Sequence, residues 1–110
     1  MAGSLIGGLI ADGWNPANIH VSDTDSAQLD RLAERFPVRT TNDNRTAVAD
    51  ADVVILAVKP QVMEDVARGI ASSVAERRPL IVSIAAGITE PTLRHWLGDD
   101  TAIVRCMPNT

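Results

Sequence analysis

The fold of this chain is decided by residues 51–58, which read Ala51-Asp52-Val53-Val54-Ile55-Leu56-Ala57-Val58. After Asp52 the stretch is a continuous apolar run of strand length that is rich in β-branched residues. A run without polar alternation is typical of a strand that is covered on both faces, as at the centre of a parallel sheet. The stretch therefore predicts an α/β fold with this strand near the middle of its sheet.

Helical and strand-like patterns alternate on both sides of this run. Segments with apolar residues at helical spacing, some of them short, predict helices near residues 5–10, 26–36, 44–50, 61–74 and 90–97. Short β-branched segments predict further strands over 18–22, 37–41, 80–84 and 101–106. Gly13 and Pro37 are expected to end the first two helices. This alternation predicts a Rossmann-like, doubly wound and mostly parallel sheet.

The predicted fold is incomplete at both ends. A doubly wound sheet normally opens with a strand and a glycine-rich turn that leads into the first helix. This sequence begins inside the pattern of that helix and stops soon after the last predicted strand. We therefore expect a chain that lacks the first strand and the glycine-rich turn. Gly3, Gly7 and Gly8 are expected to let the first helix pack closely against the sheet, since each glycine destabilises a helix.

Composition excludes several classes of function. The 110 residues carry 10 Lys and Arg against 14 Asp and Glu, a net charge of −4, so no basic stripe is available for nucleic acid. No apolar run approaches the roughly 18–20 residues that a membrane span needs, and no signal peptide is evident. We expect a cytoplasmic protein with no nucleic-acid partner, no membrane partner and no metal site. The single cysteine, Cys106, excludes an internal disulfide, and we expect it to be a small buried core residue.

The residues that follow the predicted strands are the candidate binding residues, because ligands of open α/β sheets bind beyond the carboxyl ends of the strands. They are Ser22-Asp23-Thr24-Asp25, Val58-Lys59-Pro60, Ala85-Ala86-Gly87 and Met107-Pro108-Asn109-Thr110. The first three also have a purely structural interpretation. The first segment can cap a helix, the second can be a turn with proline at the first helical position, and the third can be a bend of small residues. Taken one at a time, none of the four segments is specific.

Taken together, the motifs resemble those of one enzyme family. The sequence is similar to the N-terminal domain of pyrroline-5-carboxylate reductases in Ser4-Leu5-Ile6-Gly7-Gly8-Leu9, Asp52 to Pro60, Ser83 to Thr89, and Val104 to Thr110. The resemblance covers essentially all 110 residues. It implies that residues 1–110 are a partial dinucleotide-binding domain. This would be the NAD(P)H-binding portion of an enzyme of proline biosynthesis that reduces 1-pyrroline-5-carboxylate to L-proline.

The resemblance also implies which residues contact the cofactor. At the adenosine end these are Ser22, Asp23 and Thr24, beside the ribose and its 2′ substituent, and Asn44, on the adenine side. Along the ribose and pyrophosphate they are Ala57, Val58, Lys59 and Pro60. Near the nicotinamide they are Ala85, Ala86 and Gly87, with Asn109 between the nicotinamide and the substrate pocket. No catalytic residue is assigned.

The resemblance implies NADP as the cofactor, with NAD possible. An acidic residue after the second strand of a dinucleotide fold normally binds the ribose 2′-hydroxyl of NAD, whereas an arginine there favours NADP. Asp23 and Asp25 occupy that turn and no arginine does. The residues by themselves therefore favour NAD, while the family favours NADP and often accepts both.

The family further implies that the substrate pocket lies outside this chain. An all-helical C-terminal domain, absent here, would supply the groups that bind 1-pyrroline-5-carboxylate and the interface of a homo-oligomer. We therefore expect the chain alone to be inactive. Two alternatives stay open: a different nicotinamide dehydrogenase of the same fold, and a non-catalytic remnant or stand-alone nucleotide-binding domain.

Overall fold

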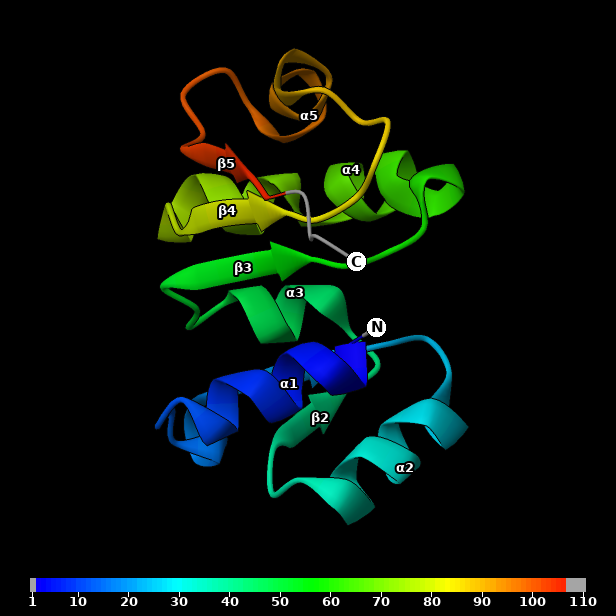
Figure 1. Cartoon of the computed structure of the whole chain (residues 1–110). Helices are drawn as coiled ribbons and strands as arrows, with labels where there is room; N and C mark the ends of the chain where they lie inside the picture. The colour runs from blue at the N-terminus through cyan, green and yellow to red at the C-terminus, as the bar shows by residue number, and fades with distance from the viewer. Residues whose placement is uncertain (1, 107–110) are drawn as a thin grey trace. The chain divides into compact units, whose positions relative to one another are not determined.

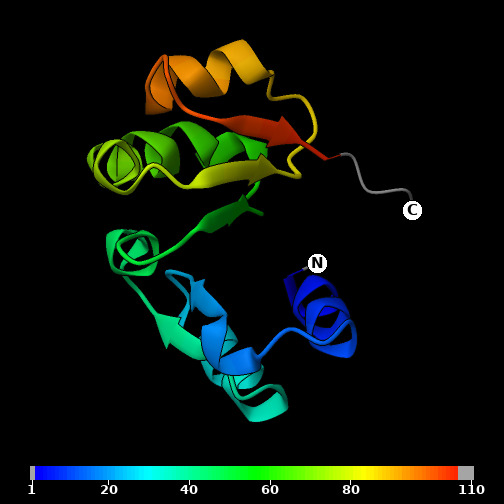
Figure 2. The ribbon, with the colours of Figure 1, turned by 90° about the vertical axis from the view of Figure 1, so that its left-hand side faces the viewer.

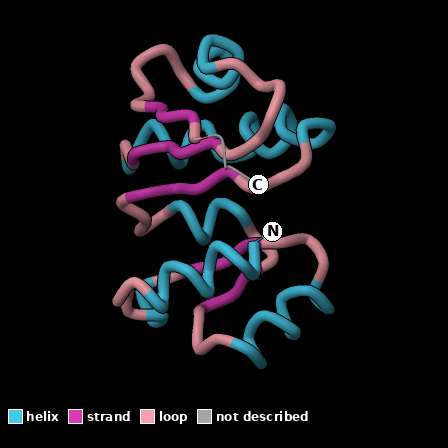
Figure 3. The backbone as a smooth tube through the Cα atoms, viewed as in Figure 1, coloured by secondary structure: helices cyan, strands magenta, loops and turns pink. Residues whose placement is uncertain are grey.

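The strands among residues 2–106 pair into two parallel sheets. The computed structural model describes residues 2–106, and the chain divides into two compact units, Met1–Ala47 (the N-terminal unit) and Val48–Thr110 (the C-terminal unit). The N-terminal unit holds a sheet of order β1-β2, and the C-terminal unit holds a sheet of order β3-β4-β5 (Figure 1). Helices alternate with these strands along the chain (Figure 3). The predicted α/β alternation with parallel strands is confirmed.

The N-terminal unit is built around one strand–helix–strand crossover. Its elements are α1 (Ala2–Ala11), the 3-10 turn η1 (Pro16–Asn18), β1 (His20–Ser22), α2 (Ser26–Arg35), β2 (Arg39–Thr41) and the first turn of α3 (Asn44–Val48). Strands β1 and β2 are parallel, and Ser22 at the end of β1 pairs with Thr41 at the end of β2. The helix α2 between them buries Leu29 and Leu32, as its helical spacing predicts.

The first turn of α2 is fixed by Asp25. Its carboxylate Oδ1 accepts hydrogen bonds from the backbone N–H groups of Ala27, at 3.0 Å, and Gln28, at 3.3 Å. These N–H groups have no partner within the helix, so the side chain satisfies them as an N-cap. The structural interpretation of this segment as a helix cap is confirmed for Asp25.

The glycines of α1 approach α2 and its end, not a strand. A Cβ placed on Gly3 would lie 3.2 Å from Nη1 of Arg35, and one on Gly7 would lie 3.4 Å from the ring of Phe36. A Cβ on Gly8 would meet no atom within 4 Å. The prediction that these glycines pack α1 against the sheet is wrong, because helical spacing fixes the face of a helix but not its neighbour. Gly13, with φ 101°, follows the end of α1 as predicted.

The C-terminal unit repeats the crossover twice. Its elements are β3 (Val53–Leu56), α4 (Pro60–Arg77), β4 (Leu80–Ser83), α5 (Glu90–Leu97) and β5 (Ile103–Arg105). All strand pairs are parallel, so that Leu56 pairs with Ser83 and Ser83 with Arg105. The helix α4 runs past its predicted end to Arg77. Pro79 lies two residues beyond that end, where it cannot continue a helix.

One face of the three-stranded sheet is packed and the other is half-open. Helices α4 and α5 lie beside each other (Figure 2), and their apolar faces form one core with alternate strand residues. The largest fully buried apolar side chains of this core are Met63, Ile70, Ile81 and Leu93. On the other face of the sheet, Val53 is 47% exposed and Val104 is 49% exposed.

The prediction that residues 51–58 form a central strand covered on both faces is therefore wrong. Within the described residues β3 is an edge strand, and β4 is the central strand of its sheet. An apolar run shows which side chains avoid water, but it does not show on which side a neighbouring strand pairs.

Cys106 lies just beyond β5 and is exposed. Its backbone N–H donates to the carbonyl oxygen of Ser83, at 2.8 Å, and so extends the pairing of β5 with β4. The prediction that Cys106 is a buried core residue is wrong, because only Ile103 of β5 is buried. Among the described residues no helix is long and apolar enough to span a membrane.

Asp25→Ala tests the cap of α2. We expect the change to destabilise the N-terminal unit by about 1 kcal/mol, because two backbone N–H groups lose their acceptor. Hydrogen exchange at the amides of Ala27 and Gln28 should accelerate. Asp30→Ala, which removes the same charge from the exposed middle of α2, is the matched control and should leave these amides unchanged. Equal effects of the two changes would contradict the cap.

Leu93→Ala tests the core of the C-terminal unit. Leu93 is 0% exposed, so its truncation leaves a cavity and should lower the free energy of unfolding by about 2–5 kcal/mol. Leu80→Ala makes the same chemical change at a side chain that is 38% exposed, and should cost roughly 1 kcal/mol or less. Urea denaturation followed by circular dichroism measures both, and a similar cost at the two positions would contradict the described packing.

Candidate functional site

Those predicted binding residues that the structure describes lie at or just after the carboxyl ends of the strands in both units. In the N-terminal unit, Ser22 and Thr41 end paired parallel strands, so the loops that follow them start at one edge. In the C-terminal unit, Leu56, Ser83 and Arg105 end the three strands at one edge in the same way. Each unit thus places its candidate residues where open α/β sheets bind ligands. We call these two places the N-terminal edge and the C-terminal edge.

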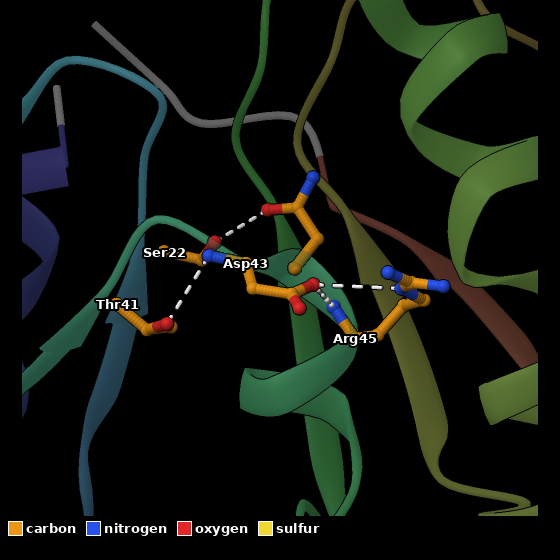
Figure 4. Close-up of polar contacts among 5 residues, drawn as sticks. Ser22, Thr41, Asp43 and Arg45 are labelled. Carbon is orange, nitrogen blue, oxygen red and sulfur yellow. Dashed lines mark hydrogen bonds and ion pairs between the residues drawn. The ribbon is translucent and has the colours of Figure 1, made fainter.

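At the N-terminal edge, two of the predicted residues are in direct contact. The hydroxyl Oγ of Ser22 donates to the side-chain oxygen Oδ1 of Asn44 at 2.5 Å, in a partly buried position (Figure 4). Twenty-two positions separate these residues in the sequence, and the parallel pairing of β1 with β2 brings their loops together. The structure therefore joins Ser22 and Asn44 into one neutral hydrogen-bonding group.

In the acidic turn after β1, the carboxylates of Asp23 and Asp25 accept hydrogen bonds from nearby backbone N–H groups. Oδ1 of Asp23 accepts from the backbone N–H of Asp25 at 2.9 Å, and Asp25 caps α2. Asn42 donates from Nδ2 to the backbone carbonyl of Asp23 at 2.9 Å and so links this turn to the loop after β2. Thr24 is exposed between the two aspartates. The two carboxylates thus hold the turn in place.

The loop after β2 brings a cation to the same edge. Oγ1 of Thr41 accepts from the backbone N–H of Asp43 at 3.1 Å, and Oδ1 of Asp43 accepts from the backbone N–H of Arg45 at 3.0 Å. The guanidinium Nε of Arg45 lies 3.5 Å from the same carboxylate oxygen (Figure 4). The backbone N–H of Arg45 is the largest cause of a lowered pKa at Asp43, and the guanidinium charge lowers it further. Asp43 is therefore ionised at neutral pH.

The family motifs predict Asn44 as a binding residue but do not single out its neighbours Asp43 and Arg45. The general rule for dinucleotide folds places the charge that binds the 2′ position in the turn after the first visible strand. The available signal was the stretch Asn42-Asp43-Asn44-Arg45, which follows the predicted edge strand directly. Only the pairing of β1 with β2 shows that this stretch shares an edge with Ser22.

At the C-terminal edge, the loop after β3 has one residue packed against the core and three residues exposed to solvent. Val58 is partly buried against the core, whereas Ala57, Lys59 and Pro60 are exposed. Lys59 immediately precedes α4 and makes no side-chain cap to it, and Pro60 opens the helix, as the structural interpretation of this turn predicts. The only lysine of the sequence thus stands exposed at this edge.

The loop after β4 forms a bend of small residues at the same edge. Ala85 is buried at 7% exposure, and its backbone N–H donates to Oγ of the buried Ser83 at 3.4 Å. Ala86 and Gly87 are exposed, and Gly87 has φ 81°, a conformation that favours glycine. The bend has no large side chain, so a flat ring or a phosphate can approach its backbone closely. Asn109 and the rest of residues 107–110 lie outside the described residues.

The two edges offer binding chemistry. They present hydroxyl, amide and backbone groups, small residues, and the cations Arg45 and Lys59. Among the described residues, no three His, Cys, Asp or Glu side chains are grouped so that they could hold a metal ion. Taken by itself, each edge carries groups that can bind a phosphate or a planar ring.

Comparison with known proteins identifies relatives across the whole chain. Residues 1–87 match the family model described as "NADP oxidoreductase coenzyme F420-dependent". The chain is 49% identical over 110 residues to the pyrroline-5-carboxylate reductase of Pseudomonas aeruginosa, with 100% of this chain and 40% of that protein covered.

Two solved structures show the same fold. A pyrroline-5-carboxylate reductase from Coxiella burnetii has a TM-score of 0.94 at 41% identity, over 99% of this chain and 40% of that one. A Plasmodium falciparum pyrroline carboxylate reductase, solved with NADP bound, has a TM-score of 0.79 at 20% identity, over 98% of this chain and 38% of that one. The chain thus spans about 40% of the length of these relatives. It belongs to the family of NADP oxidoreductases that the matching model describes, and within it is homologous to the N-terminal NAD(P)-binding domain of pyrroline-5-carboxylate reductases.

Proposed function

We propose that this chain is the NAD(P)H-binding portion of a pyrroline-5-carboxylate reductase, which reduces 1-pyrroline-5-carboxylate to L-proline. The observation that carries this proposal is the 49% identity to the Pseudomonas aeruginosa reductase, which extends over all 110 residues. A different dehydrogenase of the same fold would not be expected to match over the whole chain at this level. The activity, the substrate and a homo-oligomeric state are proposed for the whole protein, of which this chain is the cofactor-binding part.

NADP is the proposed cofactor, with NAD as a second ligand. The description of the matching family names NADP, and the Plasmodium falciparum relative was solved with NADP bound. Each edge, taken by itself, carries residues that fit one part of a dinucleotide. Ser22 and Asn44 supply neutral hydrogen-bonding groups for the adenosine end. Lys59 supplies an exposed positive charge for the pyrophosphate, and the bend at Ala86 and Gly87 leaves its backbone accessible to the nicotinamide half.

The chain's own residues would bind and orient, and we assign none of them a catalytic role. NADPH supplies a hydride for the imine carbon of 1-pyrroline-5-carboxylate, while the imine nitrogen takes up a proton. Imine reduction depends mainly on the alignment of donor and acceptor, so orientation of the nicotinamide supplies much of the rate. The small side chains at Ala85, Ala86 and Gly87 allow the backbone to hold that half of the cofactor at close range. Residues outside this chain would bind the substrate.

Lys59→Gln tests the C-terminal edge by the affinity for NADPH. The change removes a positive charge next to the proposed pyrophosphate, so the dissociation constant should rise by roughly fivefold, equivalent to about 1 kcal/mol. Arg68→Gln is the matched control, because Arg68 is exposed on α4 and pairs with Glu64 within the helix. It should leave the dissociation constant unchanged. Isothermal titration calorimetry of NADPH into the chain measures both, and an equal loss in the two variants would contradict a role of Lys59.

The proposed reaction is tested on the protein that carries this chain, purified from its source. Loss of NADPH absorbance should depend on added 1-pyrroline-5-carboxylate and should not occur with prephenate or a 2-keto acid. Activity with prephenate alone would assign the chain to another dehydrogenase of this fold. Binding of NADPH without activity on any of these substrates would favour a stand-alone nucleotide-binding domain.

A further inference from the structure

We propose that Arg45 selects NADP over NAD in this chain by binding the 2′-phosphate of the adenosine ribose. The proposal rests on the cofactor-binding function proposed above and adds a specificity-determining residue to it. The observation behind it is that Arg45 follows directly after Asn44, whose side chain contacts Ser22 at the N-terminal edge. The backbone of Arg45 thereby lies next to Asn44 at the N-terminal edge, and its exposed side chain extends from there.

Arg45 is held at this edge by the loop after β2. The carboxylate of Asp43 accepts the backbone N–H of Arg45 at 3.0 Å, and Asp43 is itself anchored by its N–H to Oγ1 of Thr41. Thr41 pairs with Ser22 across the two strands. The backbone of Arg45 is thus connected to Ser22 through a short series of hydrogen bonds and strand pairing, while its side chain extends from that anchor.

The guanidinium of Arg45 is available to an incoming anion. Its side chain is 68% exposed, and its ion pair with Asp43 is long, at 3.5 Å between Nε and Oδ1. Exposed ion pairs of this kind contribute little free energy, so a phosphate dianion can replace the carboxylate as the partner. The planar fork of the guanidinium matches two phosphate oxygens at once, which a lysine ammonium cannot do.

The acidic turn after β1 does not oppose this assignment as strongly as its sequence suggests. Asp23 and Asp25 would favour NAD if either carboxylate were directed at the ribose. In the structure Asp25 caps α2, and Asp23 accepts the backbone N–H of Asp25. The group in contact with Asn44 is the neutral hydroxyl of Ser22, whose oxygen can accept from a 2′-hydroxyl while its proton is donated to Asn44, and which can donate to a 2′-phosphate when it turns away from Asn44.

The other arginines of the described N-terminal unit lie elsewhere. Arg39 opens β2 at its amino end, opposite His20. Arg31 donates to Gln28 on α2, and Arg35 lies over the ring of Phe36 at the far end of that helix. Arg45 is therefore the arginine that directly follows the carboxyl end of β2.

The experiment compares two nucleotides that differ only at the 2′ position. Adenosine 2′,5′-bisphosphate and adenosine 5′-monophosphate are titrated separately into the chain, and their dissociation constants are measured by calorimetry. Arg45→Gln should raise the dissociation constant of the bisphosphate by about tenfold or more, because only this nucleotide carries the 2′-phosphate. The dissociation constant of the monophosphate should change by less than about twofold. The ratio of the two constants is the readout, because a general loss of structure weakens both.

Two further variants sharpen the result. Arg31→Gln removes the same charge from an exposed position on α2, and should leave the ratio unchanged. Asp43→Asn keeps an oxygen that can accept the N–H of Arg45 but removes the competing charge. The dissociation constant of the bisphosphate should fall by about threefold relative to that of the monophosphate, because the weak ion pair between Asp43 and Arg45 no longer competes with the 2′-phosphate.

The outcomes separate this inference from the function on which it rests. A selective loss of bisphosphate affinity in Arg45→Gln supports the inference. If the chain binds both nucleotides and Arg45→Gln changes neither, or weakens both equally, Arg45 is not the selective residue, while nucleotide binding stands. If the unmodified chain binds neither nucleotide, the cofactor-binding function of this chain is itself contradicted, and the inference fails with it.

Discussion

Parallel strand pairing is the constraint on which the rest of this structure depends. Strands that run in the same direction cannot be joined by a tight turn, so each connection crosses over through a longer segment, usually a helix. Here α2 connects β1 to β2, while α4 and α5 connect the three strands of the other sheet. The same pairing puts the carboxyl ends of neighbouring strands at one edge. Ser22 consequently meets Asn44, and the loops after β3 and β4 start side by side.

Residues that stabilise the fold and residues available for binding are separated along each strand and its loop. In β4, Ile81 and Ser83 are buried on the helix-covered face, and the bend that follows begins with the buried Ala85 and continues with the exposed Gly87. The turn after β1 follows the same plan, because Asp25 stabilises the start of α2 and leaves the hydroxyl of Ser22 to contact the neighbouring loop. This separation lets the edges carry small and polar residues without weakening the core.

Predictions that depend on a few consecutive residues, such as helix caps and helix ends, agree with the structure. Predictions of strand order and of the burial of Cys106, which depend on segments distant in the sequence, do not. Pro60 begins a helix and Gly13 follows one, as backbone geometry requires. Asp25 caps a helix because the acceptor and the amides lie within three residues of each other. The central placement of β3 and the burial of Cys106 are wrong, since both depend on which segments pack alongside. The positions proposed to contact the cofactor remain predictions drawn from the family motifs.

The sequence by itself determined the order of helices and parallel strands, the family, and the loops in which binding residues should be sought. These properties follow from periodicity, caps and motifs, which act over a few residues or are preserved in relatives. Only the tertiary structure decided that Arg45 shares an edge with Ser22. It also decided that the carboxylates of Asp23 and Asp25 accept hydrogen bonds from the backbone of their own turn and of the start of α2. The reason is physical: the register of β1 on β2 is fixed by hydrogen bonds between strands that are distant in sequence. The partner of a side chain across that register cannot be derived from spacing along the chain.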